Sequence, residues 1–205
     1  MELVRKSGAF AAAMDIDAAG LPFLKNLTPP AGSKTVEELA GIIRAAGVPF
    51  IVKGVMTVKG ALKAKEAGAA AIVVSNHGGR VLDQCPATAE VLPEIAEAVG
   101  GGSMKILVDG GIRNGSDVFK ALALGADGVL ICRPFVTAVY GGAEEGVAEL
   151  VNRVGGQLKD TMLCVVPIAW LKSPGIWYGN SKTVRGIRTY DRFLDGTAIN
   201  YNRKE

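Results

Sequence analysis

Several features that mark particular classes of protein are scarce in this chain of 205 residues. Its three cysteines, Cys85, Cys132 and Cys164, have neither disulfide-framework nor metal-site spacing, so we expect a reducing cytoplasmic environment. No apolar run is long enough to span a bilayer, and the first six residues lack the apolar core of a signal peptide. The net charge of +3 is too small to predict nucleic-acid binding. We therefore expect neither a membrane nor a nucleic acid as partner.

Histidine is scarcer still, because His77 is the only one in the chain. It follows the apolar run 70–74, which predicts a strand buried on both faces. The run ends in Ser75, Asn76 and, after His77, two glycines, which suit a backbone that approaches a ligand closely. If the chemistry needs an imidazole as proton acceptor, only His77 can supply it. Arg80, three residues further on, offers a planar fork for a carboxylate.

Short apolar strands alternate with amphipathic helices as far as about residue 162. The strands are expected over residues 9–16, 49–54, 70–75, 105–109 and 128–133. The helices are expected over residues 2–7, 36–46, 58–67, 86–99, 117–124 and 144–162. Thr57 and Ser116 are predicted to cap two of these helices, and Gly47 is predicted to end another. Such alternation requires a parallel sheet with helical crossovers, which places the chain in the α/β class.

Each of the five expected strands ends in polar groups. They are Asp15 with Asp17, Lys53, Ser75 with His77, Asp109 with Arg113, and Arg133. In a barrel every strand points its carboxyl end at one shared site, whereas an open doubly wound sheet concentrates such groups at one switch point. We therefore predict a partial TIM (β/α)₈ barrel of about five βα units. A closed barrel would need three more strands.

These polar residues also have purely structural interpretations. Lys53 could be a solvated strand-end charge, and the segment Asp109–Gly111 could be only a tight turn into a helix. Arg133 could pair with a carboxylate that serves the fold alone. Asp15 is expected to be a solvated loop charge, and Cys132 is expected to be a buried core thiol.

Three sequence blocks resemble the signatures of the FMN-dependent α-hydroxy acid oxidases and dehydrogenases, which include glycolate oxidase and lactate oxidase. The blocks are Val74–Asp83, Val108–Val118 and Arg133–Pro134. The resemblance covers about residues 2 to 162 and corresponds to the fourth through eighth strands of that family's barrel. It implies oxidation of an L-2-hydroxy acid of the lactate or glycolate type to a 2-oxo acid, with hydride transfer to FMN.

The resemblance also implies roles for individual residues. His77 would take the proton from the substrate's α-hydroxyl, and Asp17 would orient His77 and stabilise its imidazolium form. Arg80 would hold the substrate carboxylate. Lys53 would lie near the flavin N1 and C2 carbonyl, where a fixed cation favours the reduced cofactor.

The remaining residues are assigned by the same resemblance to FMN binding, without any metal. Ser75 would hydrogen-bond the flavin beside His77, and Asp109 would bind the ribityl chain. The phosphate would be held by Gly110, Gly111, Arg113 and Arg133.

The composition of the chain changes near residue 163. From Cys164 to the end there are seven Lys or Arg against three Asp or Glu, together with both tryptophans. Back-translated and read one base out of frame, the segment Cys164–Lys172 can spell Cys-Gly-Ala-His-Ser-Leu-Ala-Glu-Ile, which resembles the family ending. We therefore expect a barrel domain over residues 1–162 and a non-family tail over 163–205. We hypothesise that a frame change near codon 163 produced this tail, the alternative being a genuine extension.

Three functional interpretations follow. The first is the hydroxy acid chemistry, with a small 2-hydroxy acid as substrate, and the pairing of His77 with Arg80 favours it. The second is another FMN barrel enzyme, resembling the type 2 isopentenyl diphosphate isomerases. The third is a catalytically silent fragment that buries its open sheet edges by self-association, and we expect a homo-oligomer on the same ground.

Overall fold

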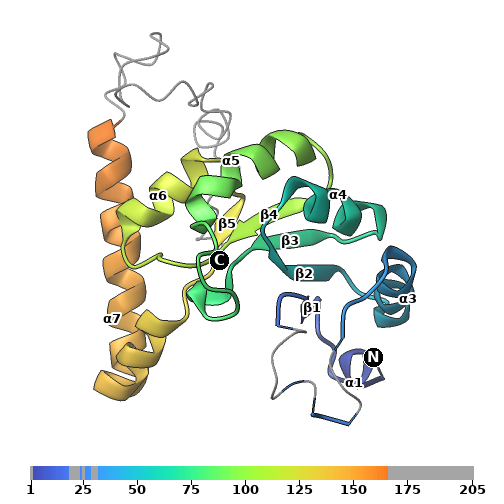
Figure 1. Cartoon of the computed structure of the whole chain (residues 1–205). Helices are drawn as coiled ribbons and strands as arrows, with labels where there is room; N and C mark the ends of the chain where they lie inside the picture. Colours follow the sequence, from blue (N-terminus) through green and yellow to red (C-terminus); the bar gives the residue numbers. More distant parts are fainter. Residues whose placement is uncertain (1, 19–23, 25, 29–31, 166–205) are drawn as a thin grey trace, which may run out of the picture. The chain divides into compact units, whose positions relative to one another are not determined.

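The computed structural model of the chain describes residues 2–18, 24, 26–28 and 32–165. Five parallel strands form one sheet in the order β1-β2-β3-β4-β5 (Figure 1). The strands are β1 (Ala12–Asp15), β2 (Phe50–Val55), β3 (Ala71–Val74), β4 (Lys105–Val108) and β5 (Gly128–Val129). The strand order never reverses, so the sheet lacks the switch point of a doubly wound fold and has the order of a barrel segment.

Helices connect the strands, as parallel pairing requires. They are α1 (Glu2–Lys6), α3 (Val36–Ala46), α4 (Val58–Glu66), α5 (Thr88–Val99), α6 (Gly115–Ala123) and α7 (Arg133–Val165), with the short 3₁₀ helix η1 (His77–Gly79) after β3. The predicted α/β class and the five alternating units are therefore confirmed. Among the described strands, β1 and β5 each pair with a single neighbour, so these strands do not close a barrel.

The central strand β3 is the most deeply buried part of the sheet. All four of its residues are buried, and Ile72 and Val74 are wholly inaccessible to solvent. Phe50 and Val52 of β2 and Leu92 of α5 are also among the most buried side chains. The uninterrupted apolar run predicted such a strand, because a strand covered on both faces needs no polar alternation. The polar residues that follow β3 are therefore attached to a fully buried strand.

Local hydrogen bonds explain where several helices begin and end. Thr57 caps α4 by accepting from the Gly60 N–H, and Gly47 ends α3 in the left-handed conformation, as predicted. The prediction that Ser116 caps α6 is wrong, because Asn114 is extended and its side chain accepts from the Asp117 N–H at 2.9 Å. An asparagine two residues earlier meets the same need.

The final helix differs from its prediction. Instead of starting at residue 144, α7 begins at Arg133 and is broken at Gly142 and Ala143, where Ala143 has a φ of +46°. Pro134 suits the first turn of a helix, because its missing N–H would have no partner there. Strand β5 therefore stops well before residue 133, and Cys132, expected in the core, is exposed ahead of the helix.

The described residues divide into two compact units. The first comprises the residues up to Ile112 together with Ala126–Ile131, and it contains the whole sheet. The second comprises Arg113–Gly125 and the residues from Cys132 onward, in which α6 packs on α7. A Cβ on Gly115 would clash with the backbone at Leu158, so glycine permits this close helix packing.

The predicted tail lies almost entirely outside the described residues, since α7 ends at Val165. Its expected boundary at residue 163 and the frame-change hypothesis both stay predictions. Of the helices that the structure describes, none combines the length and apolar character needed to cross a bilayer.

Candidate active site

Parallel pairing brings the polar ends of four strands to one edge of the sheet. Asp15 at the end of β1 lies opposite Lys53 of β2, and Val74 of β3 lies opposite Val108 of β4. The residues that follow β3 and β4 therefore emerge at the same edge as the ends of β1 and β2. Everything in this group belongs to the first compact unit.

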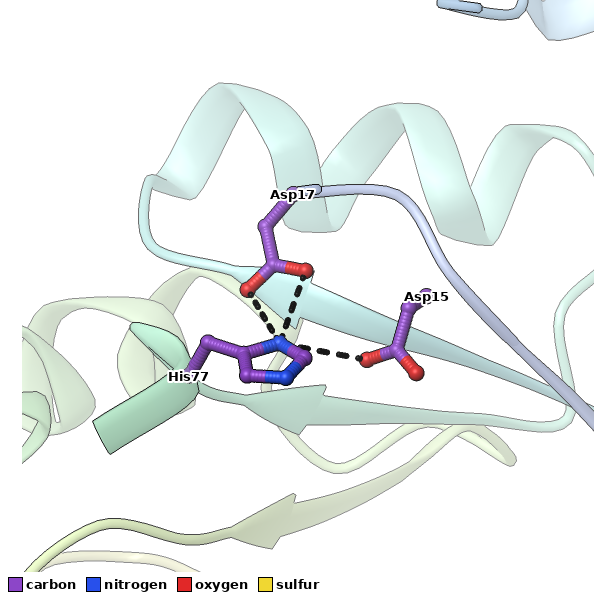
Figure 2. Close-up of side chains that lie close together, drawn as sticks. All are labelled: Asp15, Asp17 and His77. Atoms are coloured by element: carbon purple, nitrogen blue, oxygen red, sulfur yellow. Dashed lines mark hydrogen bonds and ion pairs between the residues drawn. The ribbon is translucent and has the colours of Figure 1, made fainter. Parts of the chain in front are cut away.

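The pair formed by His77 and Asp17 was predicted and is present. His77 Nδ1 lies 3.4 Å from each of the two Asp17 carboxylate oxygens (Figure 2). Only 11% of the Asp17 side chain is exposed, and its Oδ2 atom is buried without a hydrogen-bond partner. A proton on Nδ1 would leave Nε2 of His77 as an acceptor, which is the arrangement that a general base requires.

Gly54 makes room for Asp17. Strand β2 has a register irregularity between Lys53 and Val55, and Gly54 between them adopts a φ of +95°. A Cβ at this position would lie 2.6 Å from both Cβ and Cγ of Asp17, closer than atoms can approach. Only glycine fits both the backbone conformation and the space, so the placement of Asp17 depends on it.

The loop that carries His77 is held by its own side chains. His77 has a φ of +58°, and its N–H donates to Oγ of the fully buried Ser75 at 3.1 Å. Asn76 accepts from the Gly79 N–H and donates to the Pro86 carbonyl, each at 3.1 Å. These bonds hold the backbone of His77 in the left-handed conformation, which is uncommon but which histidine adopts more readily than most residues. Ser75 thus orients His77, while its predicted contact with a flavin stays a prediction.

Lys53 is the cation of the cluster. Its Nζ donates to Asp15 Oδ1 at 2.6 Å and lies 3.7 Å from Asp109 Oδ2, with 19% of its side chain exposed. Burial, the largest single effect, lowers the pKa of Lys53. The hydrogen bond that Lys53 donates to Asp15 and the charges of Asp109, Asp15 and Asp17 together outweigh it, so the pKa of Lys53 is raised. The ammonium form is therefore favoured, and the solvated-charge interpretation of Lys53 is wrong.

Asp15 was expected to be a solvated loop charge; it is exposed, but it ends strand β1 and is paired rather than free. Besides its ion pair with Lys53, Asp15 Oδ1 lies 3.9 Å from His77 Nδ1 (Figure 2). Asp15, Asp17 and His77 each offer a ligand atom within 4.8 Å of the others, a spacing that a metal ion could use. Lys53 already places a positive charge on Asp15, so the chain itself supplies a cation for this carboxylate.

Asp109 follows β4 and is held through its backbone. Its N–H donates to the Val74 carbonyl at 3.1 Å, and its carbonyl accepts from Thr88 Oγ1 at 2.7 Å. Its Oδ1 atom is buried and has no hydrogen-bond partner. Gly110 and Gly111 continue the turn with φ values of +85° and +80°. One buried acceptor of the Asp109 side chain is therefore not used by the described part of the chain.

The three predicted arginines are all exposed. Arg80 is exposed, and its Nε donates to the His77 carbonyl at 3.3 Å, so its side chain lies against the backbone of His77. Arg113 is exposed two residues before α6, and its N–H donates to Asp117 Oδ2 at 3.0 Å. Arg133 is exposed at the first position of α7. Phosphate binding by Arg113 and Arg133 stays a prediction.

Three supporting residues were not predicted as parts of the site. They are Gly54, Asn76 and Thr88, which hold Asp17, the histidine loop and the Asp109 backbone respectively. A glycine directly after a strand-end lysine was the one local signal available. Asn76 and Thr88 act through partners at least ten residues away in the chain or through the conformation of a loop. Local sequence patterns report neither.

Known proteins resemble this chain in sequence. The family model described as FMN-dependent dehydrogenase matches residues 7–171. An L-lactate oxidase of Lactobacillus jensenii is 50% identical over 125 residues, covering 61% of this chain and 30% of that protein. A peroxisomal (S)-2-hydroxyacid oxidase of Arabidopsis thaliana is 46% identical over 129 residues, covering 63% of this chain and 34% of that protein. The chain thus spans about a third of the length of these relatives.

Solved structures of a mandelate oxidase resemble the fold. One contains (S)-mandelic acid and has a TM-score of 0.68 at 36% identity, covering 78% of this chain and 53% of that one. Another contains an FMN monooxide adduct and has a TM-score of 0.68 at 38% identity, covering 78% of this chain and 52% of that one. The sheet therefore matches part of the barrel found in those oxidases.

Proposed function

Because the chain belongs to the FMN-dependent dehydrogenase family, we propose that its strand-end cluster serves the FMN-dependent oxidation of a small L-2-hydroxy acid to a 2-oxo acid. The observation that carries this proposal is the position of His77 Nδ1, 3.4 Å from the buried carboxylate of Asp17. A proton acceptor held by a carboxylate is what removal of an α-hydroxyl proton requires.

The residues at the strand ends fit an FMN cofactor. Asp17 and Asp109 each keep a buried oxygen without a hydrogen-bond partner, and Asp109 Oδ1 could accept from a ribityl hydroxyl. Lys53 offers an ammonium suited to the flavin's carbonyl edge, where negative charge develops on reduction. Gly110 and Gly111 form a turn in which backbone approach is unobstructed at Gly111. Bound FMN would supply the hydride acceptor.

The protein's own part in the reaction is to move a proton and hold the substrate. Asp17 keeps the His77 ring oriented and stabilises the imidazolium that forms when Nε2 takes the α-hydroxyl proton. Arg80 is available beside His77 to bind the substrate carboxylate through its guanidinium. The two groups lie three residues apart on one loop, so they would engage the same small molecule.

We assign the FMN phosphate to the exposed Arg113 and Arg133 together with the turn formed by Gly110 and Gly111. Arginine binds phosphate through several donors in a fixed fork, which supports this assignment. We also propose that the chain self-associates, because β1 and β5 pair on one side only among the described strands. Unpaired strand edges offer backbone donors and acceptors to another copy.

The first test is an FMN titration of the full chain, followed by anaerobic reduction with L-lactate, glycolate or (S)-mandelate. We expect saturable binding that Arg113→Ala with Arg133→Ala abolishes. His77→Ala should change FMN affinity little but slow reduction by substrate by about 10²–10⁴-fold. Lys105→Met is the matched surface control, since it changes a lysine at the opposite end of the strands. Absence of FMN binding, or reduction that survives loss of His77, would overturn the proposal.

A further inference from the structure

Asp15 is the closest carboxylate to Lys53. The two residues are register partners on the parallel strands β1 and β2, and the Nζ to Oδ1 distance is 2.6 Å. Asp109 lies further from the same ammonium, at 3.7 Å. The Asp15 side chain is 46% exposed, so it can be substituted with little change to the buried core. It also lies 3.9 Å from His77 Nδ1, between the cation and the imidazole.

The charges around Lys53 are unbalanced toward the negative. Asp15 and Asp17 face it from the end of β1, Asp109 faces it from the segment after β4, and His77 stands beside Asp15 after β3. Three carboxylates thus surround one ammonium. A negatively charged ligand entering here would meet an ammonium that a neighbouring carboxylate already engages.

We propose that Asp15 is a positioning residue for Lys53, which fixes the ammonium by a direct ion pair and limits the positive charge that this strand edge presents to an anion. The consequence for a bound flavin rests on the proposed function. With Asp15 in place, negative charge on the reduced cofactor would be stabilised less than Lys53 alone would allow. Asp15 would therefore tune the reactivity of the site without touching the reacting atoms.

The test begins with the chain without added cofactor. Acetic anhydride, a neutral reagent, acetylates only the uncharged amine, so its pH profile at Lys53, read by mass spectrometry, reports when that amine loses its proton. Trinitrobenzenesulfonate modifies the same atom but carries a negative charge. The ratio of the two rates at one pH therefore reports how strongly the edge attracts an anion.

We expect Asp15→Asn to move the acetylation profile of Lys53 to lower pH and to raise the anionic-to-neutral rate ratio by about tenfold. Asp15→Glu, which restores the charge, should restore both readouts. Glu2→Gln is the charge-matched control, because it removes a carboxylate from an exposed pair with Lys6. Asp109→Asn should have a smaller effect than Asp15→Asn, in line with its longer distance.

Two results would overturn the proposal: unchanged labelling of Lys53 in Asp15→Asn, or a larger change in Asp109→Asn than in Asp15→Asn. With FMN bound, Asp15→Asn should also raise the reduction potential of the flavin, and an unchanged potential would count against the proposal. A wild-type chain that takes up no FMN would overturn the proposed function alone, and the labelling would then decide the role of Asp15.

Discussion

The sheet carries a lysine–aspartate ion pair at the amino end and another at the carboxyl end of its strands. The two ends differ in how many of their carboxylate oxygens have hydrogen-bond partners. At the amino end, Lys105 Nζ donates to Asp127 Oδ1 at 3.0 Å, and Asp127 Oδ2 accepts from the Ile106 N–H at 2.9 Å. Both oxygens of that carboxylate are used. At the carboxyl end, Asp17 and Asp109 each keep a buried oxygen without a hydrogen-bond partner.

The difference supports the proposal that the carboxyl-end cluster binds a ligand, whereas the amino-end pair is a structural ion pair. A buried polar atom without a partner is destabilising, so an arrangement that keeps two of them within one cluster needs a reason outside stability. A ligand that donates hydrogen bonds is such a reason. The amino-end pair joins the start of β4 to the residue before β5, whereas the carboxyl-end cluster keeps two buried carboxylate oxygens without a hydrogen-bond partner.

The largest expected effect on stability compares a glycine near the carboxyl end of the strands with one near the amino end. Gly54 and Gly68 have nearly the same φ, +95° and +92°, but a Cβ on Gly54 would collide with Asp17 while a Cβ on Gly68 would meet open space. Gly68→Ala should lower the free energy of unfolding by about 1–2 kcal/mol from backbone strain alone. Gly54→Ala should lower it by roughly 3–4 kcal/mol, because overpacking adds to the strain.

Urea unfolding of the two variants, followed by circular dichroism, measures this contrast. Equal losses of stability would show that the carboxyl end is no more crowded than the amino end. In the same samples, Gly54→Ala should also displace Asp17 from His77, which a change in the His77 ring resonances would report.

A second, smaller effect separates the carboxylates. Asp127→Asn should lower the free energy of unfolding by about 1 kcal/mol, because it weakens bonds to Lys105 and to the buried Ile106 N–H. Asp109→Asn should leave stability within about 0.5 kcal/mol of the wild type or raise it, since it removes a partly unsatisfied charge from a group of three carboxylates. Matched urea titrations at neutral pH test the pair, and a greater loss in Asp109→Asn would contradict the comparison.

The smallest effect is on the pH dependence at the carboxyl end. Burial, the largest single effect, lowers the pKa of folded Lys53, but the hydrogen bond that Lys53 donates to Asp15 and the nearby carboxylate charges outweigh it, so the pKa is raised. Its stabilising contribution is therefore fully present below the unfolded lysine pKa of about 10.4 and is lost as pH rises through the folded value. As the pH rises from the unfolded to the folded pKa of Lys53, the free energy of unfolding should fall less in Lys53→Met than in the wild type. The urea midpoints of the two proteins, measured across this pH range, test this. Parallel curves for the two proteins would contradict this.

Much of this molecule could be predicted from sequence because the relevant signals are local. An apolar run specified β3, Thr57 and Gly47 marked helix ends, and alternation of strands with helices required a parallel sheet. Parallel pairing in turn required the polar strand ends to meet at one edge, so His77, Asp17 and Lys53 could be grouped before any coordinates were considered.

Only the tertiary structure decided which of these groups touch. The ion pair between Asp15 and Lys53 depends on the register of β1 against β2, which no local pattern specifies. The close approach of Gly54 to Asp17 accompanies an irregularity in the pairing of β2 with β3. Sequence by itself thus determined the fold class and singled out the residues proposed to carry chemistry, because these follow from periodicity and residue type. The partners of each charge were decided by register and close approach across strands, because residues far apart in the chain meet only once the sheet has formed.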